Sequence, residues 1–286
     1  MELQQLRYVL AVAEQRNFTR AAAQCFVAQS ALSHQVKALE HELGVPLFAR
    51  TSRRVEVTAA GEAFLPAARA CLEAADRAAT DAAGAAGLLR GSLRIGAIPT
   101  VTAVDLPRLI ERFNRAHPEV GVSLVVGASG ELQEAIEAGK LDVCFLGLPA
   151  NSVPRVAHRA LDRHRLVAVV AADHRLAGRR RVRLADLADD AFADFPAGTS
   201  GRQQSDEAFD AAGLVRSVPF ESTTAELLVD LVERHLAITL LAPGVIPRRR
   251  SIARVAVSDG PERVEYLGWR ALNPSPAARA FTELVA

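Results

Sequence analysis

Residues 29–44 read QSALSHQVKALEHELG, and this stretch has the pattern of one amphipathic helix. Its large apolar residues recur at helical spacing and are expected to face inward: Leu32, Val36, Leu39 and Leu43. Gly44 follows the last of them, at the position where a glycine commonly ends a helix. The other face carries polar side chains of middle length, namely Gln29, Ser30, Ser33, His34 and Lys37. We therefore predict a helix over residues 29–43 with one buried and one polar face.

The residues before this stretch predict two further helices. Leu3, Leu6, Leu10 and Ala13 share one face of a helix over residues 3–13. Thr19 is in position to cap a short alanine-rich helix over residues 20–25. Two short helices joined by a tight turn, the second with a polar outer face, form the geometry that enters a DNA major groove.

The residues after Gly44 predict a hairpin with a basic tip. Residues 45–48 and 55–58 have strand character, and Arg50, Arg53 and Arg54 lie between or beside them. In one interpretation these arginines contact phosphates or a minor groove. In the other they only solvate the hairpin. The helix-turn-helix pattern that precedes them favours DNA contact.

A long, alanine-rich helix is expected over residues 59–88, with Thr58 as its cap. Small side chains allow a second copy to approach closely, which favours a dimerisation helix. The alternative is a helix that packs only on its own domain.

Three runs in this region resemble the LysR-type transcriptional regulators: residues 29–40, residues 42–50 and residues 58–62. The similarity extends over residues 3–65 without a gap. It implies a winged helix-turn-helix that dimerises through the linker helix, usually as a dimer of dimers on promoter DNA. It also implies base contacts from Gln29, Ser33 and His34, and backbone or minor-groove contacts from Arg50, Arg53 and Arg54. The full set of expected DNA-binding residues adds Thr19, Arg20, Ser30 and Lys37.

Two residues depart from the family pattern. His34 stands where arginine is common, which weakens the expected bidentate contact with guanine. Ala28 stands where a capping Thr or Ser is usual, which costs about 1 kcal/mol unless a neighbour substitutes.

From Ser92 onward strands and helices alternate, which predicts parallel sheet with helices on both faces. Strands are expected over residues 93–97, 120–126 and 142–146, and a second set begins near Arg165. This α/β pattern in two lobes suggests a binding module that closes around a cleft. Residues 93–96, 139–142, 173–177 and 237–243 resemble the LysR-type effector domain, which is related to periplasmic binding proteins. The resemblance implies lobe 1 at about 91–161 and 266–286, and lobe 2 at about 162–265, after a DNA-binding domain over 1–58 and a linker helix over 59–90. In residues 233–237 relatives tend to have glycines, so Arg234 and His235 lie either on the surface or at the lobe interface.

In open α/β sheets ligands bind beyond the carboxyl ends of the strands, where helix N-termini offer amides. The residues expected there are Pro99, Thr100, Val101, Thr102, Ser129, Phe195, Thr199, Ser200, Arg202 and Thr223. Their hydroxyls and amides suit a small carboxylate, and Arg202 could neutralise it. The alternative is that each Ser or Thr only caps its helix.

Composition excludes several other classes of protein. The chain of 286 residues has a net charge of +1 and 50% hydrophobic residues, as expected for a folded chain of two or three domains. It contains no apolar run long enough for a membrane span and no export signal at its start. The cysteines, Cys25, Cys71 and Cys144, form no CxxC pair, which fits a reducing cytoplasm. No motif for a nucleophile, a phosphate loop, a cofactor or a metal is present, so we expect neither an enzyme nor a metal site.

These observations together predict a cytoplasmic, homodimeric or homotetrameric transcription regulator. It would bind double-stranded promoter DNA and a small effector, expected to be an organic acid, with RNA polymerase as a further candidate partner. Two alternatives stay open: a ligand-independent regulator with a vestigial cleft, and a two-lobed solute-binding protein.

Overall fold

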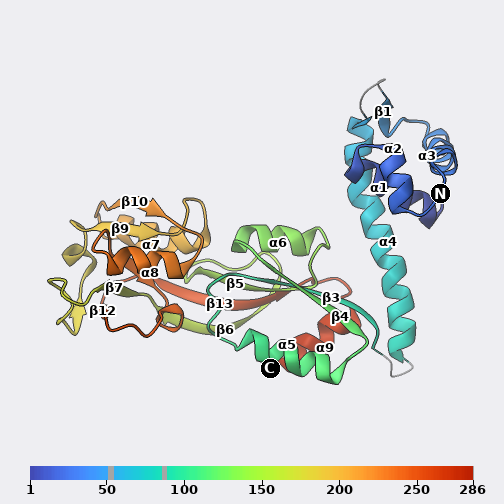
Figure 1. Ribbon diagram of the computed structural model, residues 1–286. Helices are drawn as coiled ribbons and strands as arrows, with labels where there is room; N and C mark the ends of the chain where they lie inside the picture. The colour runs from blue at the N-terminus through green and yellow to red at the C-terminus, as the bar shows by residue number, and fades with distance from the viewer. Residues whose placement is uncertain (51–54, 86–88, 286) are drawn as a thin grey trace. The chain divides into compact units, whose positions relative to one another are not determined.

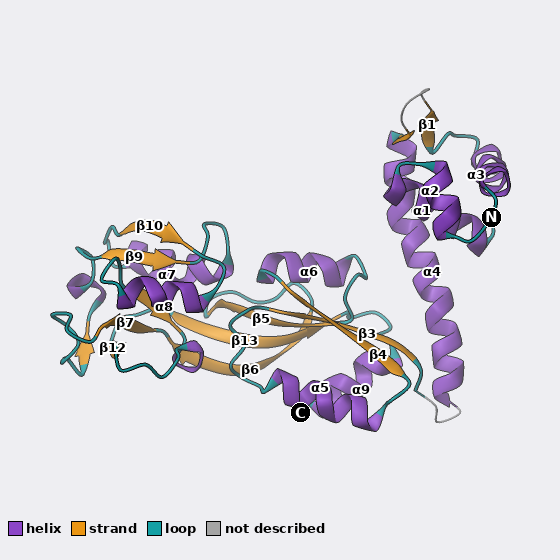
Figure 2. Ribbon diagram, in the orientation of Figure 1, coloured by secondary structure: helices purple, strands orange, loops and turns teal. Residues whose placement is uncertain are grey.

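The computed structural model describes residues 1–50, 55–85 and 89–285. Its contacts divide the chain into two compact units, Met1–Leu88 and Leu89–Ala286. Figure 1 follows the chain through both units by colour, and Figure 2 distinguishes their helices from their strands.

The first unit is a helical bundle that continues into a hairpin and a long helix. Its elements are α1 (Leu3–Gln15), α2 (Phe18–Gln24), α3 (Gln29–Leu43), β1 (Phe48–Arg50), β2 (Val55–Val57) and α4 (Ala59–Ala85). β1 and β2 pair antiparallel, as a wing requires. The α3 bounds agree with the prediction, and Gly44 ends this helix at φ 71°. The core joins all four helices and includes Val9, Val12, Leu32, Val36 and Leu65.

Two local predictions in this unit were wrong. Asn17, not Thr19, caps α2, because its side chain accepts the backbone N–H of Arg20 at 3.0 Å while Thr19 already lies in the first turn. Leu43, which was expected to face inward, is 36% exposed, since it lies at a helix end that the bundle does not cover.

The start of α4 is fixed against the hairpin. Thr58 caps the helix as predicted, with Oγ1 accepting the N–H of Gly61 at 3.0 Å and donating to the carbonyl of Pro46 at 2.7 Å. A Cβ added at Gly61 would lie 2.3 Å from the carbonyl oxygen of Leu47. A glycine is therefore needed where the first turn of α4 meets the hairpin. The predicted helix end, residues 86–88, lies outside the described residues.

The second unit contains two sheets, and the first has the order β4-β3-β5-β13-β6. Its strands are β3 (Gly91–Ala97), β4 (Val120–Val126), β5 (Val143–Pro149), β6 (Ala157–Arg165) and β13 (Glu262–Trp269). Three helices cover it: α5 (Leu106–Ala116) and α9 (Pro276–Leu284) on one face, and α6 (Ser129–Glu137) on the other.

The predicted parallel pairing is confirmed for the three strands on which it rested, since β3 pairs parallel with β4 and β5. Two further strands extend this sheet, and β13 runs antiparallel to both β5 and β6. β6 had no predicted counterpart, because it is a charged edge strand in which exposed and partly covered residues alternate.

The second lobe is built on a sheet of order β11-β7-β12-β8. These strands are β7 (Val167–Ala171), β8 (Arg181–Val182), β11 (Thr239–Leu241) and β12 (Ile252–Val257). Beside them lies the parallel pair β9 (Ala191–Asp194) and β10 (Ser217–Glu221), with α7 (Ser200–Ala211), α8 (Ala225–Glu233) and the short 3₁₀ helices η1 (Leu184–Asp186) and η2 (Pro243–Val245). The chain leaves the first lobe after β6 and returns to it on β13. β13 therefore belongs to the first sheet and also borders the second lobe.

Candidate functional site

The exposed face of α3 carries the polar row that the sequence predicted. Gln29, Ser30, His34 and Lys37 are exposed and Ser33 is half-buried, while the opposite face is sealed in the core. The spacing of four between Gln29, Ser33 and Lys37 aligns them along one side of the helix. This surface fits a polar groove.

The surroundings of α3 extend that surface. Thr19 and Arg20 are exposed on α2, and the Arg20 guanidinium donates to the carbonyl of Gln15 at 3.0 Å. Ala28 is the N-cap of α3 and makes no side-chain cap hydrogen bond. Arg50 ends β1, whereas Arg53 and Arg54 lie outside the described residues.

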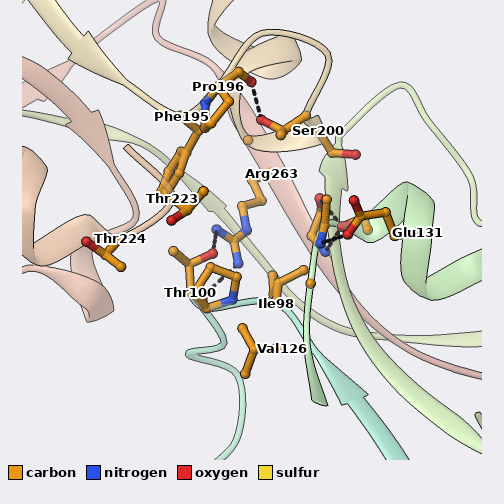
Figure 3. A pocket seen from close by; sticks show the side chains of 17 residues that line it. Ile98, Thr100, Val126, Glu131, Phe195, Pro196, Ser200, Thr223, Thr224 and Arg263 are labelled. Atoms are coloured by element: carbon orange, nitrogen blue, oxygen red, sulfur yellow. Dashed lines mark hydrogen bonds between the residues drawn. The ribbon is translucent and has the colours of Figure 1, made fainter. Parts of the chain in front are cut away.

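The second unit has a cavity of about 540 Å³ between its two lobes (Figure 3). The first lobe contributes the segments after β3 and β4, and the second lobe contributes the β9–α7 loop and the segment before α8. Both sets lie at the carboxyl ends of parallel strands, where ligands bind in α/β folds. Its lining residues are Ile98, Pro99, Thr100, Val126, Gly127, Ala128, Ser129, Glu131, Gly147, Phe195, Pro196, Thr199, Ser200, Gly201, Thr223, Thr224 and Arg263.

The cavity brings together most of the predicted ligand-binding residues. Pro99, Thr100, Ser129, Phe195, Thr199, Ser200 and Thr223 line it, whereas Val101, Thr102 and Arg202 do not. Arg202 instead pairs with Asp206 and Glu221, each at 2.9 Å, and so links α7 to β10. The guanidinium of Arg202, which the sequence suggested as a partner for a ligand, is therefore already paired with acidic side chains of the second lobe.

Arg263 on β13 is the basic residue of the lining, and sequence reasoning missed it. The side chain is only 3% exposed. Its guanidinium donates to Thr100 Oγ1 at 2.9 Å and to the Thr100 carbonyl at 2.7 Å, and lies 3.1 Å from Glu265 Oε1. Burial lowers the pKa of Arg263, and the charge of Glu265 opposes that shift. The sequence did contain a signal, because Arg263 and Glu265 fall on the same face of a strand whose remaining residues after Glu262 are mostly apolar.

Glu265 fixes the loop that borders the cavity. Its carboxylate accepts the backbone N–H groups of Thr102 at 2.9 Å and Ala103 at 3.0 Å, and the hydroxyl of Thr102 at 2.5 Å. The predicted ligand contact at Thr102 is thus a contact within the protein. The Arg263–Glu265 pair holds the 100–103 loop against β13.

The hydroxyls of the lining divide into two kinds. Thr100 accepts from Arg263, Ser129 exchanges hydrogen bonds with the backbone of Gly147, and Thr199 caps α7 by accepting the N–H of Arg202 at 3.3 Å. The hydroxyl of Thr224 shares a hydrogen bond with that of Ser222 at 3.3 Å. For Ser200 and Thr223, we find no hydrogen bond of the hydroxyl to any part of the chain that the structure describes. These two hydroxyls, both from the second lobe, are therefore available to a ligand.

The charges around the cavity are balanced. Besides Arg263, the described lining has one ionisable side chain, Glu131, which accepts the N–H of Ala128 at 3.2 Å in the first turn of α6. Ile98, Val126 and Phe195 form apolar walls. The cavity suits a small molecule with an apolar body and a hydrogen-bonding or anionic end.

The described residues give little support to a metal site, a membrane-spanning helix or a reactive thiol at Cys144. They contain no cluster of three side chains that could hold a metal ion, and none of their helices is long and apolar enough to span a membrane. Cys144 is buried in β5, and burial raises the pKa of its thiol to about 12, which makes it a poor nucleophile.

Comparison with known proteins identifies two domains in this chain. Residues 3–62 match the model of the bacterial regulatory helix-turn-helix protein, lysR family, and residues 86–286 match that of the LysR substrate binding domain. A hydrogen peroxide-inducible genes activator of Pectobacterium carotovorum subsp. carotovorum is 34% identical over 87% of this chain and 82% of its own length. A RuBisCO operon transcriptional regulator of Allochromatium vinosum is 31% identical over 100% of this chain and 95% of its own.

Solved structures give the same assignment over the full length. A full-length OxyR variant from Pseudomonas aeruginosa has a TM-score of 0.74 and 26% identity, with 100% of this chain and 93% of that chain covered. Full-length CbnR complexed with its target DNA has a TM-score of 0.71 and 29% identity, with 100% and 99% covered. With residues 3–62 and 86–286 both matched by family models, this chain belongs to the LysR family of DNA-binding transcriptional regulators with an effector-binding domain.

Proposed function

We propose that this LysR-type regulator reads an imperfect inverted repeat near a promoter. The residues proposed to contact DNA are Thr19, Arg20, Gln29, Ser30, Ser33, His34, Lys37, Arg50, Arg53 and Arg54. The exposed polar row of α3 and the antiparallel hairpin that follows it support this set. Residues 1–58 form the proposed DNA-binding domain, and the linker helix over residues 59–90 joins two copies, which assemble as a cytoplasmic dimer or dimer of dimers.

The proposed effector is a small organic acid bound in the cavity between the lobes of residues 91–286. The observation that carries this proposal is the 540 Å³ cavity, with free hydroxyls at Ser200 and Thr223 and a buried guanidinium at Arg263. The first turn of α7 also faces the cavity, and its dipole favours negative charge. The effector acts by binding one arrangement of the oligomer better than another, which changes the spacing or bend of the bound DNA.

The name of the Pectobacterium relative refers to hydrogen peroxide, but the cysteines of this chain argue for another signal. Peroxide sensing by a thiol needs an accessible thiolate. Cys71 is exposed and Cys25 is half-buried, but both lie in the first unit, outside the effector-binding domain. Cys144, the cysteine of that domain, is buried and does not line the described cavity, and burial raises the pKa of its thiol. We therefore propose a non-covalent effector.

A ligand-independent regulator is the alternative that the structure supports best. Arg263 already has partners in Thr100 and Glu265, and four of the lining hydroxyls make protein hydrogen bonds. In this alternative the cavity is vestigial.

Thermal unfolding with a panel of small carboxylic acids at millimolar concentration tests the effector. A ligand that binds the folded state raises the unfolding temperature. We expect stabilisation by at least one acid, loss of that stabilisation in Ser200→Ala/Thr223→Val, and no loss in Ser123→Ala, an exposed serine on β4 that serves as the control. No shift with any acid would favour the ligand-independent alternative.

Capture of sheared genomic DNA at two salt concentrations tests the DNA-reading proposal. A few intergenic sites that share a dyad should be recovered, and recovery should weaken with salt and in Arg53→Ala/Arg54→Ala. Uniform recovery of all sequences would contradict the proposal.

A further inference from the structure

Phe26, in the turn between α2 and α3, has two unfavourable properties at once. Its side chain is 96% exposed. Its backbone has a φ of 56°, in the left-handed region that large side chains rarely adopt. Four described residues other than glycine have positive φ, namely Arg16, Phe26, His235 and Asn273, and only Phe26 among them is apolar.

The turn itself requires this backbone conformation. The N–H of Phe26 donates to the carbonyl of Ala23 at 3.2 Å, and the N–H of Val27 donates to the carbonyl of Ala22 at 3.0 Å. These two bonds form a Schellman motif, in which the left-handed residue is usually glycine. Glycine occupies this position after α3, α6 and α7, where Gly44, Gly139 and Gly213 have φ between 66° and 71°. The same motif after α8 has His235, a polar residue, at φ 59°.

A glycine at position 26 would remove both costs without changing the turn. It would relieve the backbone and take an aromatic ring out of water. Unfavourable conformations of this kind persist mostly at functional sites. The ring therefore has a role in a bound state, where a partner covers it.

The position of Phe26 identifies that partner. It lies three residues before Gln29, the first residue of the exposed polar row of α3, and Ala28 between them is also exposed. A duplex that receives α3 lies directly beside this turn. DNA offers apolar groups for a ring to contact, namely deoxyribose carbons and the thymine methyl group.

We propose that Phe26 is a DNA contact whose ring packs on deoxyribose and thymine methyl groups at the edge of the α3 footprint. This inference rests on the DNA-reading function proposed above. The ring adds affinity for sites that have thymine at this edge, which the polar row does not supply.

The test begins with a duplex that the wild-type full-length protein selects from a random-sequence library. Burial of part of a phenyl ring predicts that Phe26→Gly binds this duplex about tenfold more weakly than wild type. Phe26→Leu, which keeps the backbone cost and some apolar surface, should lose about threefold by the same argument. His235→Gly relieves a φ of 59° in the other unit and should leave DNA affinity unchanged.

Two further measurements distinguish a contact from an effect on folding. The unfolding temperature of Phe26→Gly should equal or exceed that of wild type, because the strained backbone is relieved. Replacing thymine by deoxyuridine at the edge of the duplex should weaken wild type and not Phe26→Gly. If Phe26→Gly does not fold, Phe26→Asn provides the same comparison, since asparagine tolerates left-handed backbone.

Each outcome decides the proposal. Equal affinity of wild type and Phe26→Gly would overturn it while leaving the DNA-reading function intact. Equal affinity together with a change in oligomeric mass would assign Phe26 to a contact between proteins, which also overturns it. A wild-type protein that selects no duplex would overturn both the contact and the function on which it rests.

Discussion

Replacing Arg263 with methionine should destabilise the effector-binding unit severely. The guanidinium is 3% exposed and Glu265 is 2% exposed, so the substitution leaves a carboxylate buried without its counter-ion. Thr100 also loses the donors to its carbonyl and hydroxyl oxygens. Removing one partner of a buried ion pair costs about 3–5 kcal/mol. We expect a loss in this range for Arg263→Met.

The double variant Arg263→Met/Glu265→Gln separates the ion pair from general packing. The double variant has no buried charge left without a counter-ion. It should therefore be about 2 kcal/mol more stable than the summed losses of Arg263→Met and Glu265→Gln predict. Urea unfolding followed by tryptophan fluorescence measures these values, because Trp269 on β13 is the only tryptophan of the chain and reports this unit. A loss below about 1 kcal/mol for Arg263→Met, or strict additivity in the double variant, would refute the reasoning.

Three further outcomes follow from the described contacts. Gly61→Ala should destabilise the first unit by more than about 2 kcal/mol in urea unfolding, because its Cβ would lie 2.3 Å from the carbonyl oxygen of Leu47. An unchanged free energy of unfolding would show that this turn can shift to accommodate the methyl group. Asn17→Ala should lower the free energy of unfolding by about 1 kcal/mol, because it removes the cap of α2. Ala28→Ser should raise the free energy of unfolding by a smaller amount, because it adds a cap to α3. If both variants were as stable as wild type, water would satisfy these helix ends as well as a capping side chain does. Burial raises the pKa of Asp194 from 3.8 to about 6, so the folded chain binds more protons than the unfolded chain between these values and stability falls as pH rises through that window. Asp194→Asn should flatten that part of the curve of stability against pH, and an unchanged slope would assign it to other groups.

The sequence predicted best the elements whose signals are local. The bounds of α3 and β4 agree with the predicted residues 29–43 and 120–126, because apolar spacing and a following glycine or turn mark both ends. The cap of α2 was misplaced by two residues, since Asn17 and Thr19 are both good caps and only the backbone decides between them. β8 and β12 were missed because β8 has two residues and β12 is defined by pairing with β7 and β8, far away in sequence.

The same distinction applies to the cavity. Loops after strands could be identified from the order of strands and helices, and seven of the ten proposed residues line the cavity. The sequence could not show that Thr102 is bound by Glu265 or that Arg202 is bound by Asp206 and Glu221. Arg263 and Thr100 are 163 residues apart, so their contact depends on the antiparallel return of β13. Long-range pairing of this kind leaves no periodicity in the sequence.

In the proposed function, the position of Arg263 would link effector binding to the arrangement of the lobes. β13 carries Arg263 and Glu265 and pairs with both β5 and β6, the strand on which the chain leaves the first lobe. Through these two side chains β13 also holds the 100–103 loop at the cavity. An anion that accepted hydrogen bonds from Arg263 would compete with Thr100 for the same donors and so would change how that loop is held against β13. The proposed effector contact and the lobe crossing therefore share one strand, and a ligand that preferred one setting of this loop would shift the balance between lobe arrangements by that preference alone.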